Sequence, residues 1–135
     1  MTDPVRETAA MIAAMAPVLD PATYAFVTLA DPARAAAALP LALASFREDE
    51  GLSLILPLPT ARGLGFADPI PMARITLTVQ SALDGTGLTA AVATALAQAE
   101  IPCNMVAAFH HDHVFVPAAK AARALAVLQT RATRP

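Results

Sequence analysis

Hydrophobic and polar residues alternate most regularly in segment 74–81, RITLTVQS. Because side chains of a β-strand point alternately to its two faces, this alternation predicts a strand with one buried face. Segment 88–99 instead repeats its large apolar side chains every four residues, which predicts a helix with one buried stripe. The positions expected to be buried by these two patterns are Ile75, Leu77, Val79, Leu88, Val92 and Leu96.

The segments that follow complete a recognisable order of elements. We expect a strand over 101–109, a tight turn at 110–112, a returning strand over 113–116 and a last helix that Pro117 opens. The second half then reads β-α-β-β-α, which is a ferredoxin-like unit without its final strand. We expect a strand of the first half to fill that edge of the sheet.

The first half predicts shorter and less regular elements. Apolar residues spaced for one helical face indicate a helix over 4–16, and the breakers at Pro17 and 20–23 end it. Aromatic and β-branched residues over 24–29 predict a strand, and the alanines of 31–40 predict a turn with a short helical piece.

The segment 44–58 reads as two strands joined at 48–51, the second of which is apolar enough to be an inner strand. The run 57–71 is rich in proline and glycine, so we place a domain boundary there. The expected fold class is α+β, with two ferredoxin-like units in tandem, 1–71 and 72–135. Each unit is expected to be an antiparallel sheet with helices on one face.

Composition narrows the function classes. Of the 135 residues, 56% are hydrophobic and 15% are charged, and the formal net charge is -2. Binding to nucleic acid requires a cluster of basic side chains, which this sequence does not contain. The longest uncharged runs, 8–19 and 85–99, are shorter than the roughly 20 apolar residues of a membrane span. We therefore expect neither nucleic acid nor a membrane as a partner.

The sequence also predicts where the protein works and how it assembles. Its first residues, MTDPVRE, carry acids where a signal peptide requires positive charge, and the single Cys103 cannot form an internal disulfide. Both features are typical of the cytoplasm. Much of the apolar content is alanine, which buries little area per residue, so we expect two chains to share surface in a homodimer.

The run 75–109 resembles the ACT domain, a small regulatory module that binds amino acids. The resemblance rests on an apolar strand, a polar turn that ends in glycine, and an apolar helix followed by the next strand. The positions that carry it are Gly87, Leu88, Leu96 and Ile101. The segments 46–56 and 111–117 resemble a bacterial subgroup of stand-alone proteins with two ACT-like halves.

The resemblance implies a non-enzymatic module that binds an amino acid or a similar small metabolite and acts on a regulated enzyme. It implies no catalytic residue, no metal and no cofactor. Carried over residue by residue, it assigns the ligand to two short segments. The implied ligand-binding residues are Asp84, Gly85, Thr86, Gly87, Leu88, Ile101, Pro102 and Asn104.

Physical chemistry supports the first of these segments independently. Gly85 and Gly87 permit positive φ angles and a close approach of a ligand to the backbone. The free N–H groups at the start of the predicted helix attract a carboxylate, and Asp84 beside them can accept an ammonium group. The alternative is a tight turn in which Asp84 acts only as a cap.

The chain's three histidines all lie in 110-HHDH-113. In an extended segment His111 and His113 share one face, so with Cys103 they offer an alternative function, a small metal-binding protein or hydrolase. The simpler interpretation is that Asp112 caps the turn and the two histidines pair with it or with a backbone carbonyl, at a ligand pocket or a subunit interface. A ligand-free structural adaptor is a further alternative.

Overall fold

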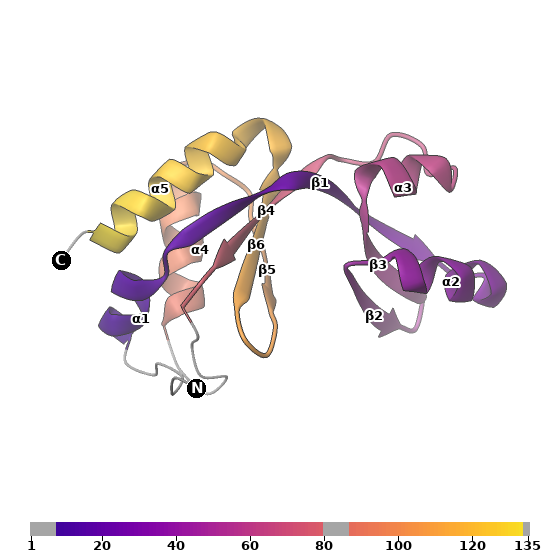
Figure 1. Ribbon diagram of the computed structural model, residues 1–135, viewed down its shortest axis with the longest axis horizontal. Coiled ribbons are helices and arrows are strands. Elements are labelled where there is room, and N and C mark those ends of the chain that lie inside the picture. The colour runs from indigo at the N-terminus through magenta and orange to yellow at the C-terminus, as the bar shows by residue number, and fades with distance from the viewer. Residues whose placement is uncertain (1–7, 80–86, 134–135) are drawn as a thin grey trace. The chain divides into compact units, whose positions relative to one another are not determined.

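The computed structural model describes residues 8–79 and 87–133 (Figure 1). The chain forms two compact units. Unit 1 combines Met1–Pro21 with Ala73–Pro135, and unit 2 is Ala22–Met72. Unit 2 is thus a continuous segment that lies, along the chain, inside unit 1.

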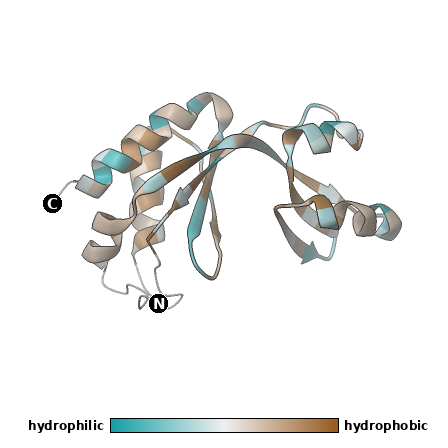
Figure 2. Ribbon diagram, in the orientation of Figure 1, coloured by the Kyte–Doolittle hydropathy of each residue, from teal (hydrophilic) through white to brown (hydrophobic). Residues whose placement is uncertain are grey.

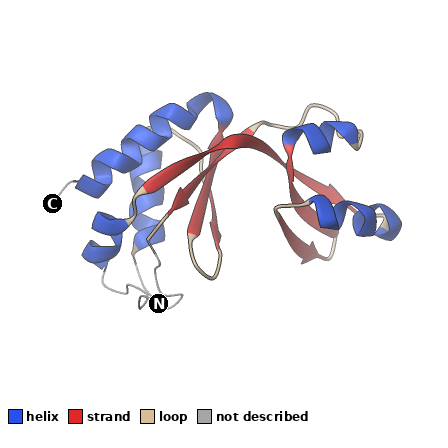
Figure 3. Ribbon diagram, in the orientation of Figure 1, coloured by secondary structure: helices blue, strands red, loops and turns tan. Residues whose placement is uncertain are grey.

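The described residues contain six antiparallel strands and helices that connect and flank them (Figure 3). Their hydrogen-bonded order is β2-β3-β1-β4-β6-β5. The strands are β1 Pro17–Leu29, β2 Ala44–Glu48, β3 Gly51–Pro57, β4 Met72–Leu77, β5 Asn104–Ala107 and β6 Asp112–Pro117. The predicted α+β, ferredoxin-like class is confirmed.

Unit 1 contains the elements predicted for the second half of the chain. They are β4, α4 (Leu88–Gln98), β5, β6, the short 3-10 helix η2 (Ala118–Lys120) and α5 (Ala121–Thr133). The start of β1 lies beside β4 and supplies the strand that this β-α-β-β-α order lacks. A backbone hydrogen bond of 2.7 Å from Thr78 N–H to the carbonyl of Met15 continues this contact beyond the strand.

The core of unit 1 lies between one face of its sheet and the helices α1 (Thr8–Ala14), α4 and α5. All six positions that the two periodic patterns predicted to be buried belong to this core. Burial of each large aliphatic side chain contributes about 1.5–3 kcal/mol, so this stripe accounts for the docking of α4 on β4. The opposite face of α4, with Thr89, Ala90 and Thr94, is exposed in the single chain.

Unit 2 repeats the same element order. It contains the end of β1, α2 (Pro32–Ala38), the 3-10 helix η1 (Leu39–Leu41), β2, β3 and α3 (Leu58–Gly63). Asp31 caps α2 by accepting a hydrogen bond from the N–H of Arg34 at 3.2 Å. Its core lies between the helices and the inner face of the strands, and Figure 2 colours the residues of these elements from hydrophilic to hydrophobic. The members of the core are Ala25, Leu29, Ala38, Leu54, Leu56, Leu58 and Ala61.

The prediction of a turn at 20–23 is wrong, because these residues lie within the strand β1. Its pairing with β3 covers only residues 24–29, so Pro17 and Pro21 lie where β3 requires no N–H donor. The predicted helix 4–16 is confirmed over Thr8–Ala14, and its first residues lie outside the described ranges. Ala16 turns the chain into β1 with φ +35°.

The proline- and glycine-rich run 57–71 contains the helix α3 (Leu58–Gly63), which its residue pattern did not predict. In α3, Pro59 occupies the first turn, where its missing N–H has no helical partner in any case. Leu58 and Ala61 are buried in the core of unit 2, and this burial stabilises so short a helix.

Candidate functional site

The start of α4 lies at one end of unit 1. Gly87 takes φ +99° in the left-handed region, which a side chain disfavours, and α4 begins at Leu88. The carbonyl of Gly87 accepts the first helical hydrogen bond, from the N–H of Ala91 at 2.9 Å. Leu88 is buried in the core and fixes this end of the helix. The other implied ligand residues of this segment, Asp84, Gly85 and Thr86, lie outside the described residues.

The second implied segment lies at the opposite end of α4. Ile101 is buried in the core, and its N–H donates to the carbonyl of Leu96 at 2.9 Å. Pro102 and Asn104 are exposed. The 11 residues of α4 separate the two segments by roughly 16 Å along the helix axis. A single copy of unit 1 therefore does not bring them together.

The histidine segment lies at the same end as the start of α4. His111 Nδ1 donates a long hydrogen bond of 3.5 Å to the carbonyl of Val79, the last residue described before the loop. The loop 108–111 closes with a hydrogen bond of 3.1 Å from the N–H of Ala108 to the carbonyl of His111. Asp112 is half-buried at the start of β6, opposite Ala107.

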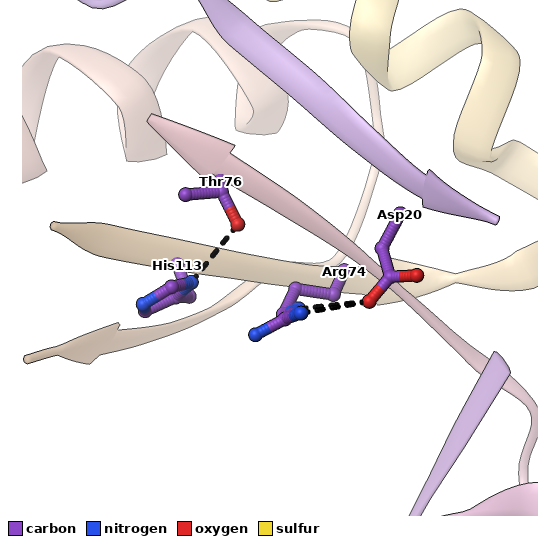
Figure 4. Close-up of polar contacts among 4 residues, drawn as sticks. All are labelled: Asp20, Arg74, Thr76 and His113. Atoms are coloured by element: carbon purple, nitrogen blue, oxygen red, sulfur yellow. Dashed lines mark hydrogen bonds and ion pairs between the residues drawn. The ribbon is translucent and has the colours of Figure 1, made fainter. Parts of the chain in front are cut away.

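Polar side chains line the face of the unit 1 sheet that carries no helix (Figure 4). The guanidinium of Arg74 donates to the carboxylate of Asp20 from Nη2 at 2.8 Å and from Nε at 3.1 Å. Two residues after Arg74 on β4, the Thr76 hydroxyl and His113 Nδ1 share a hydrogen bond of 3.0 Å. Neither partnership was predicted from the sequence, because the paired residues lie 54 and 37 positions apart.

Burial lowers the pKa of His113, and the positive charges of Arg74 and His111 lower it further. Asp112 opposes this shift. The neutral imidazole is therefore the favoured form at neutral pH, and it suits a hydrogen bond with an uncharged hydroxyl. Unit 1 thus combines the N-terminus of α4 with the uncharged, hydrogen-bonded side chains of Thr76 and His113.

The geometry does not assemble a metal or nucleophile site from the histidines and Cys103. In the β5–β6 register His113 faces Val106, three residues from Cys103, which corresponds to about 10 Å along a strand. Burial raises the pKa of the Cys103 thiol, which disfavours the nucleophilic thiolate. Within residues 8–79 and 87–133, no three side chains of His, Cys, Asp or Glu are grouped to hold a metal ion.

Family comparisons agree with the fold. Residues 4–73 match one family model described as ACT domain, and residues 72–130 match a second with the same description. The sequence matches no curated protein. Over its described ranges the chain contains no helix of the length and apolarity that a membrane crossing requires.

Among solved structures, the chain is similar to a Vibrio cholerae protein of unknown function, described as a possible transport protein. The two share 38% identity and a TM-score of 0.82, over 93% of this chain and 95% of that one. The ligand-free regulatory subunit of aspartate kinase from Thermus thermophilus has 12% identity and a TM-score of 0.63, over 85% and 95% of the two chains. An Agrobacterium tumefaciens protein has 19% identity and a TM-score of 0.56, over 82% and 81%.

Proposed function

Because the chain belongs to the ACT domain family, we propose that it is a non-enzymatic regulatory protein that binds an amino acid as a homodimer. The observation that carries this proposal is the start of α4. Gly87 turns the backbone with a positive φ, so the loop leads directly into the free N–H groups of the first helical turn. Those groups attract the carboxylate of an amino acid.

Asp84 is proposed to accept the ligand's ammonium group, while Gly85, Thr86 and Gly87 let the ligand approach the backbone. Leu88 holds the helix start in place through its burial in the core. The donor His111 and the hydroxyl of Thr78 flank this end of unit 1. On this proposal a zwitterion binds the positive pole of the helix through its carboxylate and Asp84 through its ammonium group.

The second segment supports a site that two copies share. Pro102 and Asn104 are exposed at the far end of α4, so they fit a ligand that is held by the loop of a neighbouring copy. Ile101 supports them from the core. On this proposal the ligand bridges two chains and stabilises the homodimer.

Regulation requires that the ligand bind two states with different affinities. The proposed partner is a regulated enzyme whose activity depends on which state is bound. The proposed location is the cytoplasm, where a lone thiol such as that of Cys103 stays reduced.

The test is a thermal-shift screen of the untagged protein against the twenty amino acids, with Zn²⁺ and EDTA in separate wells. An amino acid at about 100 times its dissociation constant stabilises the folded state by roughly 2.7 kcal/mol, so the melting temperature should rise. No shift with any amino acid would overturn the proposed ligand class. A fall with EDTA alone would favour a metal protein, and no change in any well would favour an adaptor.

The variant Asp84→Ala locates the site. It should weaken binding of the amino acid found in the screen at least tenfold in calorimetry, because the ammonium group loses its acceptor. Asp49→Ala, which removes an exposed carboxylate from the β2–β3 turn, is the matched control and should bind normally. Equal isotherms for both variants would remove Asp84 from the site.

A further inference from the structure

A groove lies between α4 and α5, which pack against each other on the helix-covered side of the unit 1 sheet (Figure 1). Its volume is about 400 Å³. Ala95 and Ala99 line it from the side of α4, and Ala126 and Val127 line it from α5. Val127 also packs against the core of unit 1. The groove thus has an apolar lining of mostly small side chains, which leaves room for a partner to approach closely.

Two arginines of α5, Arg123 and Arg131, line the same groove. They are eight positions apart, which corresponds to roughly 12 Å along the helix axis. Within residues 8–79 and 87–133, no carboxylate forms an ion pair with either guanidinium. The described lining contains no acidic residue, and neither α4 nor α5 contains aspartate or glutamate. The groove is therefore a positively charged surface on a chain whose formal net charge is -2.

The exposed side of α4, next to this groove, carries no charge. A helix at the surface of a soluble protein usually has charged or polar side chains opposite its buried face. The exposed residues of α4 are instead Thr89, Ala90, Thr94, Ala97 and Gln98. Lys120 ties the segment before α5 to the end of α4 by donating to the carbonyl of Glu100 at 3.0 Å. The two helices thus present a supported, uncharged surface with positive charge along one side.

We propose that this groove docks an acidic helix of the regulated enzyme, with two carboxylates that are two helical turns apart. The inference rests on the regulated enzyme of the proposed function and names the surface that receives it. Positions i and i+7 of a helix share one face and are about 10–11 Å apart, which matches the spacing of Arg123 and Arg131. The alanines between the arginines let the incoming backbone approach closely, as in other helix-in-groove contacts.

The same geometry disfavours other occupants. A free amino acid is too short to reach both arginines across roughly 12 Å. The same face of a second copy carries the same two arginines, so its approach brings like charges together. Nucleic acid requires more basic side chains, and aromatic rings for stacking, than the described lining of the groove contains.

The groove is separate from the proposed ligand site but shares α4 with it. The groove uses Ala95, Gln98 and Ala99, at the end of the helix, and none of the proposed ligand-binding residues. The proposed ligand loop leads into the other end of the same helix. A state of unit 1 that repositions α4 therefore changes both surfaces, as regulation of an enzyme by a ligand requires.

The first test uses synthetic helices as probes of the groove. The main probe has about 18 residues of alanine, leucine and glutamine, with two glutamates at positions i and i+7. In amide NMR spectra of the isotope-labelled full chain, it should shift the signals of Ala95, Ala99 and Ala126 in a saturable way. A helix with glutamates at i and i+4 reaches only one arginine, so its dissociation constant should be about threefold or more higher.

The second test changes the arginines and keeps the main probe. Arg123→Gln with Arg131→Gln should raise the dissociation constant of the probe about fivefold or more, because both ion pairs are lost. Arg34→Gln with Arg62→Gln removes two exposed arginines of unit 2 and is the matched control. It changes the net charge equally and should bind the probe with the wild-type affinity. None of the four arginines belongs to a core, so both double variants should fold, which circular dichroism checks.

The outcomes separate this inference from the proposed function. A probe that leaves the groove signals unshifted, or that binds equally to the wild type and to Arg123→Gln with Arg131→Gln, would overturn the docking surface. Equal weakening by both double variants would show unspecific charge attraction and would overturn it as well. Cosedimentation with phosphatidylserine vesicles without any response to the probe would assign the surface to a membrane. If the probe binds the groove but no amino acid shifts the melting temperature, the docking surface stands and the proposed ligand class fails.

Discussion

The two units share their element order, but the helix-free faces of their sheets differ in chemistry. In unit 1 this face carries the ion pair of Asp20 with Arg74 and the hydrogen bond of Thr76 with His113. In unit 2 the same face carries Phe26 and Phe46, which are 45% and 73% exposed, and the buried Ile55. The inner faces of both units are aliphatic, because both must bury their sheet against helices.

This difference shows which part of the fold is free to specialise. The inner face is constrained by packing, whereas the outer face can be polar or apolar without changing the order of the strands. A face whose polar groups are partly buried and paired, as in unit 1, suits a polar ligand. An exposed aromatic beside an open edge suits a protein contact.

The largest expected effect is on the free energy of unfolding, and it distinguishes the buried Phe115 of unit 1 from the exposed Phe46 of unit 2. Phe115, on β6 beside His113, is 1% exposed, so Phe115→Ala should lower the free energy of unfolding by about 3–5 kcal/mol. Phe46→Ala should change it by about 0.5 kcal/mol or less, because the ring is already in water. Urea unfolding followed by circular dichroism, at concentrations where both variants are monomeric, measures both. Similar losses for the two variants would contradict the assigned exposure.

An intermediate effect is expected at the ion pair of unit 1. The side chains of Arg74 and Asp20 are 23% and 16% exposed, so Arg74→Met leaves a partly buried carboxylate without its guanidinium. The loss should be about 1–3 kcal/mol in urea unfolding. Arg62→Met, on an exposed helical position, is the matched control and should cost about 0.5 kcal/mol or less.

The double variant Asp20→Leu with Arg74→Met sharpens this result. If the cost of the single change comes from the unpaired charge, the double variant should recover part of the stability. A double variant that is no more stable than Arg74→Met alone would contradict this explanation, because the loss would then not come from a charge left without its partner.

The smallest expected effect is a dependence of the folding stability on pH, through His113. Because burial, Arg74 and His111 hold the pKa of His113 below its ordinary value of 6.5, the unfolded chain binds more protons between the two pKa values. Stability should therefore be constant above pH 6.5, fall as the pH falls through the lowered pKa, and level off below it.

His113→Asn should flatten this slope in thermal unfolding between neutral and mildly acidic pH, while His110→Asn, on an exposed residue, should preserve it. A slope that is unchanged by His113→Asn would assign the proton uptake to another group.

Much of the fold could be predicted because local patterns reflect burial. The periodic residues of β4 and α4 are all in the core, and the apolar segment 52–56 lies in β3, between β2 and β1. Where the local patterns predicted the wrong element or none, tertiary contacts determined the secondary structure. The breakers Pro17 and Pro21 lie in a strand because β3 does not pair there, and α3 forms in a proline-rich run because Leu58 and Ala61 are buried.

The candidate site was predictable only in its parts. The glycine-rich loop and the histidine run each carry a local signal, and Gly87 does take a positive φ. Their placement at one end of unit 1 depends on the pairing of β4 with β6, which joins Val79 to His111 across 32 positions. No local pattern encodes such a contact, because many alternative pairings satisfy the same alternation of residues.

By itself, then, the sequence determined the periodic elements, their buried faces and the class of fold, because periodicity and turn residues act over a few positions. The tertiary structure decided which strand completes unit 1, which residues meet Arg74 and His113, and that Phe46 lies exposed at a sheet edge. These features depend on strand order and register, which arise from contacts between segments far apart in the chain.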